Sequence, residues 1–157
     1  MDFKSSYLIS LRLLQRRDYS EHELRQKLIK RKISSETIDE TIEKLLTDNY
    51  LNDQRYINGK MRYFIKQKKS PAYIQNKCFN MGVPVSLEDI NFHFDELKVS
   101  IKEHIRDHIK KKLDFGRIDL NNLSDKERFN LSYKLSNHLF SKGYKDFNVP
   151  DILKEVS

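Results

Sequence analysis

The chain has few of the residues that crosslink a fold or interrupt its regular elements. Its 157 residues include one cysteine, Cys78, four glycines, three prolines and no tryptophan. A single cysteine excludes an intramolecular disulfide and a cysteine-rich zinc site. So few glycines and prolines disfavour an all-β sandwich, which needs a turn about every 8–12 residues. Helices joined by a small number of turns are therefore the favoured architecture.

Long hydrophobic runs are missing as well. No segment approaches the roughly 18 consecutive apolar residues that cross a membrane. The first residues include an acid at Asp2 and a base at Arg12, a pattern unlike a secretory signal. We therefore expect a cytoplasmic protein that has no membrane partner.

The composition favours a large charged surface over a thick core. Hydrophobic residues make up 38% of the chain and charged residues 34%, against about 45–50% and about 25% in typical soluble domains. The net charge is +7, which is too small for its length to indicate disorder. The isoelectric point near 9.4 indicates an acidic partner, for which nucleic acid is one candidate.

Hydrophobic residues recur with a helical period along most of the chain. Tyr7, Leu11 and Leu14 fall at i, i+4 and i+7, which predicts a first amphipathic helix. The pattern breaks and restarts repeatedly, so we expect nine helices. The sequence S-x-x-E at residues 20–23 and 124–127 predicts two capping boxes, in which serine and glutamate each bind the other's backbone amide.

Several helix boundaries follow from single residues. We expect Asp53 to cap the fourth helix, and Gly82 to end a fifth helix that begins at the Ser-Pro pair of residues 70–71. A long seventh helix is expected from hydrophobic residues spaced by four, followed by a loop over residues 114–123. The spaced residues are Leu97, Ile101, Ile105, Ile109 and Leu113. In the eighth helix, Phe129, Tyr133 and Phe140 lie beside a second stripe, formed by Leu131, Leu135 and Leu139.

The chain also matches itself at a fixed offset. Residues 20–33 match residues 70–83 at an offset of 50, through serine, apolar positions and a turn. Gly143 and Tyr144 match residues 82–83 at an offset of 61. Offsets near 50 predict a helical repeat array, in which each module is a helix, a capped helix, a turn and a helix. The alternative is an ordinary helical protein, because any such protein has capped helices with leucine stripes.

Basic residues are concentrated in one segment. Residues 54–87 contain seven lysines and arginines and no acid, with tyrosines and phenylalanines between them. A cationic face of this kind attracts phosphates or an acidic protein groove, and its tyrosines can stack on bases. The alternative is a merely solvated face. We expect Phe64 and Phe79 to pack into the core, because both lie on apolar stripes.

Motifs of catalysis are not found. The sequence has no P-loop, G-x-G-x-x-G, H-E-x-x-H or G-x-S-x-G. His104 and His108 have a spacing that could hold a metal, but we interpret them as surface or boundary histidines. Cys78 takes the repeat position of Leu28 and is expected to be a small core residue. We therefore predict that the protein is not an enzyme and has no cofactor, metal site or catalytic residue.

Four segments together resemble the RecX family, bacterial regulators of the RecA recombinase. The opening pattern of that family is similar to residues 11–28, LRLLQRRDYSEHELRQKL. The most specific segment, residues 50–56, reads YLNDQRY. SPAYI at residues 70–74 with MGV at 81–83 resembles its second repeat, and FSKGY at 140–144 resembles its third.

The resemblance implies a fold and a function. The implied fold is all-α, with three tandem three-helix repeats over residues 1–52, 53–95 and 96–157 that form an elongated curved array. The implied partner is the RecA filament on DNA, within whose groove the protein would bind and modulate, mostly by inhibition, recombinase and ATPase activity. Weak, non-specific DNA binding by a monomer is also expected.

The sequence departs from the family pattern in its second repeat. Gln75 and Asn76 stand where an arginine is frequent, and Ser70 replaces the usual glycine. These departures leave open which face meets the filament, so we choose contact residues on charge alone. The eight residues predicted to contact the filament or DNA are Arg16, Arg17, Arg55, Lys60, Arg62, Lys66, Lys68 and Lys69.

Two other functions fit the same sequence. The first is a free-standing DNA-binding helical protein such as a repressor, with the helix after Ser70 as its reading helix. A reader would bind one duplex sequence tightly without RecA, whereas the regulator would bind DNA weakly and without sequence preference. The second is a structural scaffold, which would not bind DNA even at low salt.

Overall fold

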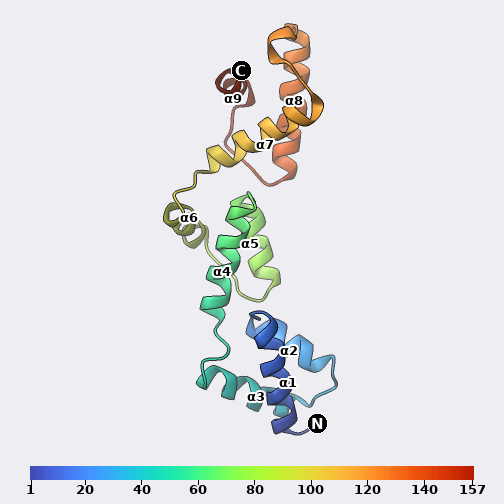
Figure 1. The fold of residues 1–157 in the computed structure, drawn as a ribbon, viewed down its shortest axis with the longest axis vertical. Helices are drawn as coiled ribbons and strands as arrows, with labels where there is room; N and C mark the ends of the chain where they lie inside the picture. The colour runs from blue at the N-terminus through green and yellow to red at the C-terminus, as the bar shows by residue number, and fades with distance from the viewer. The chain divides into compact units, whose positions relative to one another are not determined.

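The computed structural model describes all 157 residues and contains only helices. This confirms the predicted all-α class and the expected nine α-helices, to which one short 3-10 helix is added. No helix has both the length and the apolar character needed to cross a membrane. The elements are α1 Phe3–Arg16, α2 Glu21–Ile29, α3 Ser35–Thr47, α4 Asp53–Lys66, α5 Pro71–Asn80, α6 Leu87–Glu96, α7 Ile101–Gly116, η1 Leu120–Asn122, α8 Asp125–Ser141 and α9 Val149–Val156 (Figure 1).

The contacts between residues in space divide the chain into two compact units. The first unit comprises Met1–Tyr63 and Gln75–Ser86, and the second comprises Phe64–Ile74 and Leu87–Ser157. This division does not test the predicted repeat boundaries at residues 52 and 95, which stay a prediction.

The core of the first unit lies among α1, α2 and α3, which pack against one another (Figure 1). Where α1 meets α3, the contact includes small polar residues: Ser6, Ser10 and Thr41 are fully buried, and the Thr41 hydroxyl lies 2.8 Å from that of Ser6. Ser10 and Thr41 also donate to backbone carbonyls of their own helices, so both buried hydroxyls are satisfied. The buried hydrophobic residues of this core are Tyr19, Leu24, Leu28, Ile33, Ile38, Ile42, Leu45 and Leu51.

A second core lies among α7, α8 and α9 in the second unit. Each of these helices contributes apolar residues at helical spacing, and Tyr144, from the turn after α8, is fully buried among them. The buried residues of this core are Ile105, Ile109, Leu113, Leu120, Leu135, Leu139, Tyr144, Val149 and Leu153.

The seventh helix differs from its predicted bounds at both ends. It begins at Ile101, because Ser100 forms a capping box with Glu103. Leu97 therefore lies outside it, in the turn after α6 that Lys98 closes with a positive φ of 54°. At the other end the helix continues to Gly116, so the expected loop at 114–123 starts late and also contains η1.

The aromatic residues are less buried than predicted. Phe64 packs into the interior as expected, but Phe79 is 68% exposed, so its predicted burial is wrong. On α5 the inward positions are taken by Ile74 and Cys78, both fully buried, and Phe79 follows Cys78 onto the outer face. In α8 the side chains of Leu135 and Leu139 are buried in the core. The neighbouring aromatic stripe of Phe129, Tyr133 and Phe140 is exposed.

The turn that ends α2 recurs after α5 and after α8. Lys32, Gly82 and Gly143 occupy the same position in it, with φ of 59°, 78° and 84°. In each case the next amide donates to a carbonyl five residues earlier, in a Schellman-type bond from Ile33, Val83 or Tyr144. These three turns are separated by the offsets of 50 and 61 seen in the sequence. The same turn also ends α3, α4, α6 and α7, through the amides of Tyr50, Lys69, Val99 and Ile118. It is therefore the common helix ending of this chain, and only the glycines at 82 and 143 distinguish the repeat positions. The all-helical structure fits the predicted helical repeat array.

Two of these turns, after α5 and after α8, are each joined by a serine hydroxyl to the start of an earlier helix. Ser20 Oγ accepts from the Glu23 amide at 3.1 Å and donates to the Met81 carbonyl at 2.8 Å. Ser70 Oγ accepts from the Tyr73 amide at 3.2 Å and donates to the Lys142 carbonyl at 2.7 Å. We call this two-sided contact the serine clasp. It uses each hydroxyl once as an acceptor that caps a helix and once as a donor to a distant turn.

The clasp requires glycine in the turn that it holds. A Cβ added at Gly82 would lie 2.3 Å from His22 Cβ, and one at Gly143 would lie 2.7 Å from Ser70 Oγ. Lys32 occupies the equivalent position after α2 and has an exposed side chain. The same backbone turn therefore needs glycine only where a preceding module packs against it.

Replacing Ser20 should lower the free energy of unfolding more than replacing a serine that only caps a helix. Ser20→Ala removes the cap of α2, worth about 1 kcal/mol, and leaves the Met81 carbonyl without its donor, a further ~1–2 kcal/mol. Ser34→Ala removes the cap of α3 and a local, exposed hydrogen bond to the Thr37 hydroxyl, without a distant partner, and should cost about 1 kcal/mol. Urea unfolding of both variants measures the difference, and equal losses would contradict the two-sided role of Ser20.

Two substitutions in equivalent turns should change stability in opposite directions. Lys32→Gly relieves a left-handed residue and should leave stability unchanged or raise it by up to about 1 kcal/mol. Gly82→Ala places a Cβ against His22 and should cost about 2 kcal/mol or more. The two thermal midpoints, measured against wild type, check this. A harmless Gly82→Ala would show that the turn can move away from α2.

Candidate functional site

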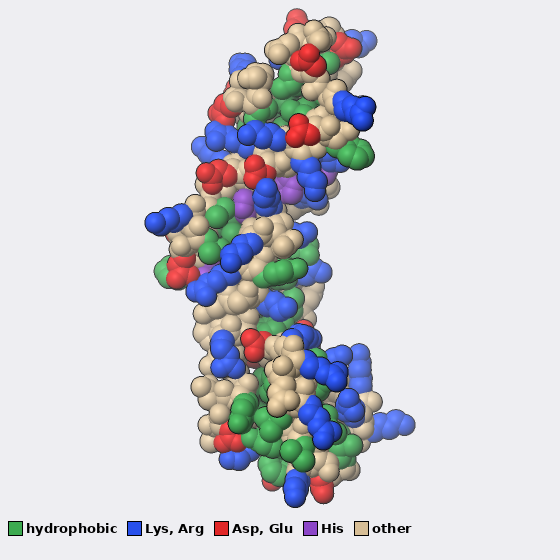
Figure 2. All heavy atoms as spheres, viewed as in Figure 1, with side chains coloured by type: hydrophobic (Ala, Val, Ile, Leu, Met, Phe, Trp, Pro, Cys, Tyr) green, Lys and Arg blue, Asp and Glu red, His purple; other side chains and the backbone are tan.

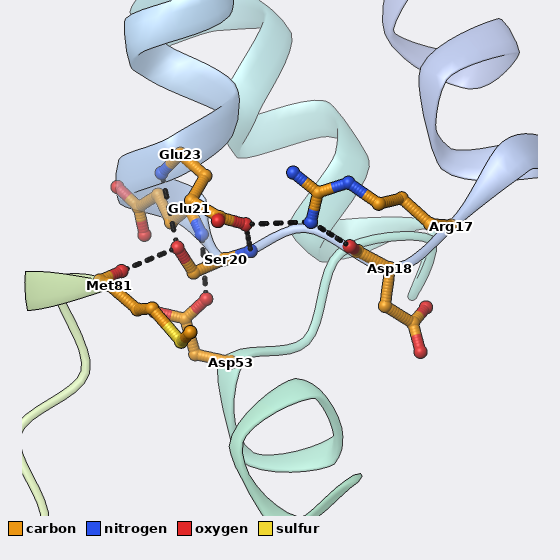
Figure 3. Close-up of polar contacts among 7 residues, drawn as sticks. All are labelled: Arg17, Asp18, Ser20, Glu21, Glu23, Asp53 and Met81. Carbon is orange, nitrogen blue, oxygen red and sulfur yellow. Dashed lines mark hydrogen bonds and ion pairs between the residues drawn. The ribbon is translucent and has the colours of Figure 1, made fainter. Parts of the chain in front are cut away.

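The segment that links α1 to α2 forms a dense polar junction in the first unit (Figure 3). Glu23 Oε2 accepts from the Ser20 amide at 3.4 Å, which completes the predicted capping box, and from Arg17 Nη1 at 3.2 Å. Arg17 Nη1 also donates to the Asp18 carbonyl at 3.0 Å, and its guanidinium lies 3.7 Å from the centre of the Tyr19 ring. Arg17, one of the predicted contact residues, is therefore held by its neighbours.

Asp53 extends this junction from the start of α4. Its Oδ1 accepts from the Glu21 amide at 2.7 Å, in the first turn of α2 (Figure 3), where a carboxylate is favoured by the helix dipole. The predicted cap role of Asp53 is wrong, because Asn52 Oδ1 accepts from the Arg55 amide instead. The residues that carry the family resemblance here thus build the joint between helices.

Five of the eight predicted contact residues lie in the first unit. Arg16 is exposed at the end of α1. Arg55 Nη2 donates to the Tyr50 carbonyl at 3.2 Å, and Lys60 Nζ lies 5.6 Å from the centre of the Tyr56 ring. The five residues are Arg16, Arg17, Arg55, Lys60 and Arg62.

A shallow cavity of about 290 Å³ lies on this face of the first unit. Arg17 and Lys60 outweigh the single acid in its lining, Asp18, and Tyr63 is an exposed aromatic at its edge. A Cβ on Gly59, in the middle of α4, would meet no atom within 4 Å. Glycine in a helix interior lowers stability by about 0.5–1 kcal/mol relative to alanine. No close packing within the chain explains why residue 59 is a glycine. The α4 backbone is consequently open to close approach at this cavity.

The other three predicted residues lie in the second unit and differ in their surroundings. Lys68 Nζ is 2.7 Å from Asp107 Oδ2, and this ion pair holds the pKa of the Asp107 carboxyl below its usual value. Lys66 is exposed at the end of α4. Lys69 Nζ lies 5.0 Å from the centre of the Tyr73 ring. The structure thus distributes the predicted residues over both units.

A larger cavity in the second unit brings Lys69 together with residues that the sequence prediction missed. It has a volume of about 530 Å³, and no acidic side chain lines it. We call it the lysine pocket. Its lysines at 111 and 112 were visible in sequence as a charge cluster, but the stabilisation of a helix C-terminus explained them equally well. The lining residues are Gln67, Lys69, His108, Lys111, Lys112, Phe115, His138 and Lys142.

Histidines form a buried group in the second unit. His104 is only 4% exposed, so its predicted surface or boundary position is wrong, whereas His108 is half-buried. The His104 ring lies 5.5 Å from that of Phe94, and its Nδ1 is buried without a hydrogen-bond partner. Burial is the main cause that lowers the pKa of His104, His108 and His138. No group of three or more His, Cys, Asp or Glu side chains that could hold a metal ion occurs.

Cys78 is a core residue, as predicted. Its side chain is fully buried, and burial raises the pKa of the thiol to about 11. The thiol therefore stays protonated at neutral pH and is a poor nucleophile.

Comparison with known proteins shows similarity to one family. A family model described as the first three-helix domain of RecX matches residues 7–45. "Regulatory protein RecX" of Syntrophotalea carbinolica is 27% identical over 138 residues, 86% of this chain and 85% of that protein. The same-named protein of Actinobacillus pleuropneumoniae serotype 5b is 37% identical over 73 residues. The chain is thus similar to RecX proteins, over residues 7–45 in the family model and over 86% of its length in the Syntrophotalea relative.

Solved RecX structures have the same fold. The crystal structure of RecX from Lactobacillus salivarius has a TM-score of 0.74 at 22% identity and covers 98% of this chain and 96% of its own. A second structure of regulatory protein RecX has a TM-score of 0.69 at 18% identity. The match to the Actinobacillus relative spans 46% of this chain and about half, 48%, of that RecX protein.

The buried and half-buried histidines of the second unit predict how the stability of the protein depends on pH. Because their pKa values are lowered on folding, the unfolded chain binds more protons than the folded chain as pH falls through about 6.5. The contribution of these histidines to the free energy of unfolding should therefore be fully present above that pH, and the free energy of unfolding should decrease as the pH falls to 5.5. His104→Phe should reduce this dependence and keep stability at pH 7.5. Urea unfolding at three pH values measures it, and an unchanged slope in the variant would contradict the assignment to His104.

Proposed function

We propose that the protein binds the RecA–DNA filament and modulates, mostly inhibits, the recombinase and ATPase activities of RecA. It would act by occupying the filament groove, without catalysis. The observation that carries this proposal is similarity to the RecX family, together with a fold shared with a solved RecX structure over 98% of the chain. The partner, the filament, comes from the resemblance of residues 11–28 and 50–56 to that family.

The distribution of charge supports binding through many weak contacts. Each unit has its own exposed cations and its own basic cavity. Within each unit, the face drawn in Figure 2 shows Lys and Arg side chains dispersed among hydrophobic and acidic ones. Contacts that are weak singly become strong when several act on one filament, because the later ones form within an existing complex.

The α4 face is the contact that the first unit offers best. Arg17 and Lys60 place positive charge beside Tyr63, and Gly59 leaves the helix backbone uncovered between them. A partner surface could therefore approach α4 closely there, with its carboxylates or phosphates near the two cations.

One observation weighs against the alternative of a repressor that reads duplex DNA with α5. Reading helices present their N-terminal residues to base edges. Ser70, the cap of α5, is only 1% exposed, and its hydroxyl is bound to the Lys142 carbonyl. Gly143 lies against the same end of the helix, near Ser70 and Ala72. The start of α5 is thus occupied by the turn that follows α8.

Titration into a RecA ATPase assay on single-stranded DNA tests the proposal. We expect ATPase to fall at protein concentrations below that of RecA. An unrelated basic protein of similar charge is the control and should have no effect in this range. Inhibition that begins only when the protein is abundant enough to coat the DNA would contradict filament binding and favour the nucleic-acid-binding alternative.

Charge reversal should separate binding from folding. The sequence alone favours reversal of Lys66, Lys68 and Lys69 together, but Lys68 is paired with Asp107 and is better left intact. Lys66→Glu with Lys69→Glu should raise the concentration for half-inhibition about tenfold, since two reversed contacts cost on the order of 1–2 kcal/mol. The thermal midpoint should remain near that of wild type.

The matched control reverses two exposed lysines of α8. Lys126→Glu with Lys134→Glu changes the net charge equally and lies outside both cavities. It should inhibit like wild type. Equal loss in both double variants would mean that only net charge matters, and no loss in the Lys66/Lys69 variant would remove these residues from the contact.

A further inference from the structure

The lysine pocket is built by three separate segments of the second unit. The turn after α4 contributes Gln67 and Lys69, the C-terminal half of α7 contributes one face, and the end of α8 with the residue after it contributes the third wall. On α7, His108, Lys111 and Phe115 follow each other at i, i+3 and i+7, so they share a face of the helix. Residues distant in sequence thus converge on one cavity.

Hydrogen bonds fix these walls to one another. Tyr144 Oη donates to the Lys68 carbonyl at 2.6 Å, and His108 Nε2 lies 2.9 Å from the same oxygen. A carbonyl can only accept, so His108 must carry its proton on Nε2 in this contact. The serine clasp from Ser70 holds the carbonyl of Lys142. The pocket is therefore preorganised, which reduces the entropic cost of binding.

The pocket has an excess of positive charge. Four lysines line it, no carboxylate does, and the nearby Lys68 is already neutralised by Asp107. The C-termini of the neighbouring helices contribute only about half a negative charge each. After burial, Lys112 and Lys142 are the main causes that lower the pKa of His138, so their field reaches the imidazole. An anion in the pocket would relieve the repulsion among these lysines.

An exposed aromatic ring distinguishes this pocket from a simple anion site. Phe115 lines the pocket and is 89% exposed. A planar apolar group stacked on this ring would cover it. A single-stranded nucleic acid supplies such a base next to each phosphate, whereas an acidic peptide supplies carboxylates without a regular partner for the ring. In a duplex the base faces are already stacked and are not available.

We propose that the lysine pocket binds a backbone phosphate of single-stranded DNA while the adjacent base stacks on Phe115. The choice of DNA as the polymer rests on the proposed function. The pocket itself is a binding site formed by this chain alone, and it acts without RecA.

Binding of fluorescent oligothymidine to the protein alone, measured by anisotropy at low salt, tests this site. Lys111→Gln with Lys112→Gln should weaken binding about tenfold and make the salt dependence shallower by about 0.7 for the lost phosphate contact. Lys102→Gln with Lys134→Gln lowers the net charge equally, on the same two helices but outside the pocket, and should have little effect. Equal effects of the two pairs would overturn the proposal.

An abasic oligonucleotide isolates the stacking contact. Phe115→Ala should weaken binding of oligothymidine at least about fivefold, since stacking on an aromatic ring contributes about 1–3 kcal/mol per base. It should not weaken binding of an abasic strand of the same length, which has phosphates only. The side chain is almost fully exposed, so its loss should not unfold the protein. Unchanged oligothymidine binding by Phe115→Ala would overturn the stacking part of the proposal.

The same variants separate this site from filament binding. If the Lys111/Lys112 variant keeps wild-type oligothymidine affinity but loses inhibition of the RecA ATPase, the pocket contacts protein, and the proposal is overturned. If wild-type protein binds oligothymidine through the pocket but never affects RecA, the pocket proposal stands and the proposed function fails.

Discussion

The fold depends on serine hydroxyl groups that each accept one hydrogen bond and donate another. A serine at the start of a helix ordinarily accepts one backbone amide and leaves its own proton to water. In this chain Ser20 and Ser70 donate that proton to a carbonyl 61 and 72 residues further along. Because each hydroxyl oxygen also caps its own helix, the position of the donor relative to that helix is fixed. Gly82 and Gly143 then follow as a requirement of close approach.

The sequence predicted several features that depend on local chemistry. The capping boxes at Ser20 and Ser124 and the turn glycine at 82 follow from interactions within a few residues, and they are present as predicted. The predicted cap of α4 and start of α7 failed because Asn52 and Ser100 cap these helices instead. The predicted burial of Phe79 failed for another reason, because it depends on which of two neighbouring helix faces turns inward. Phe79 and the aromatic stripe of α8 are as apolar as the stripes beside them, and only the packed neighbours decide between these faces.

The predicted site shows the same limit. Charge in the sequence identified Lys69, but its companions in the lysine pocket come from α7 and α8, about 40 to 70 residues away along the chain. No spacing rule joins such distant residues. The prediction of Arg17 as a contact residue did not anticipate its bonds to Asp18 and Glu23. In this protein the family-like residues near Arg17 mostly hold helices together, so Arg17 combines a structural role with its place in the cavity of the first unit.

The helix-ending turns contain a further compromise. Six residues other than glycine have positive φ, and four of them are cationic: Lys32, Lys68, Lys98 and Arg117. Each left-handed backbone costs on the order of 1 kcal/mol that a glycine would avoid. A long basic side chain at the C-terminal end of a helix regains part of this cost from the dipole and adds to the positive surface. Thermal stability and positive charge therefore compete at the same positions. A relative adapted to heat could gain stability there only by giving up some of its attraction for anions.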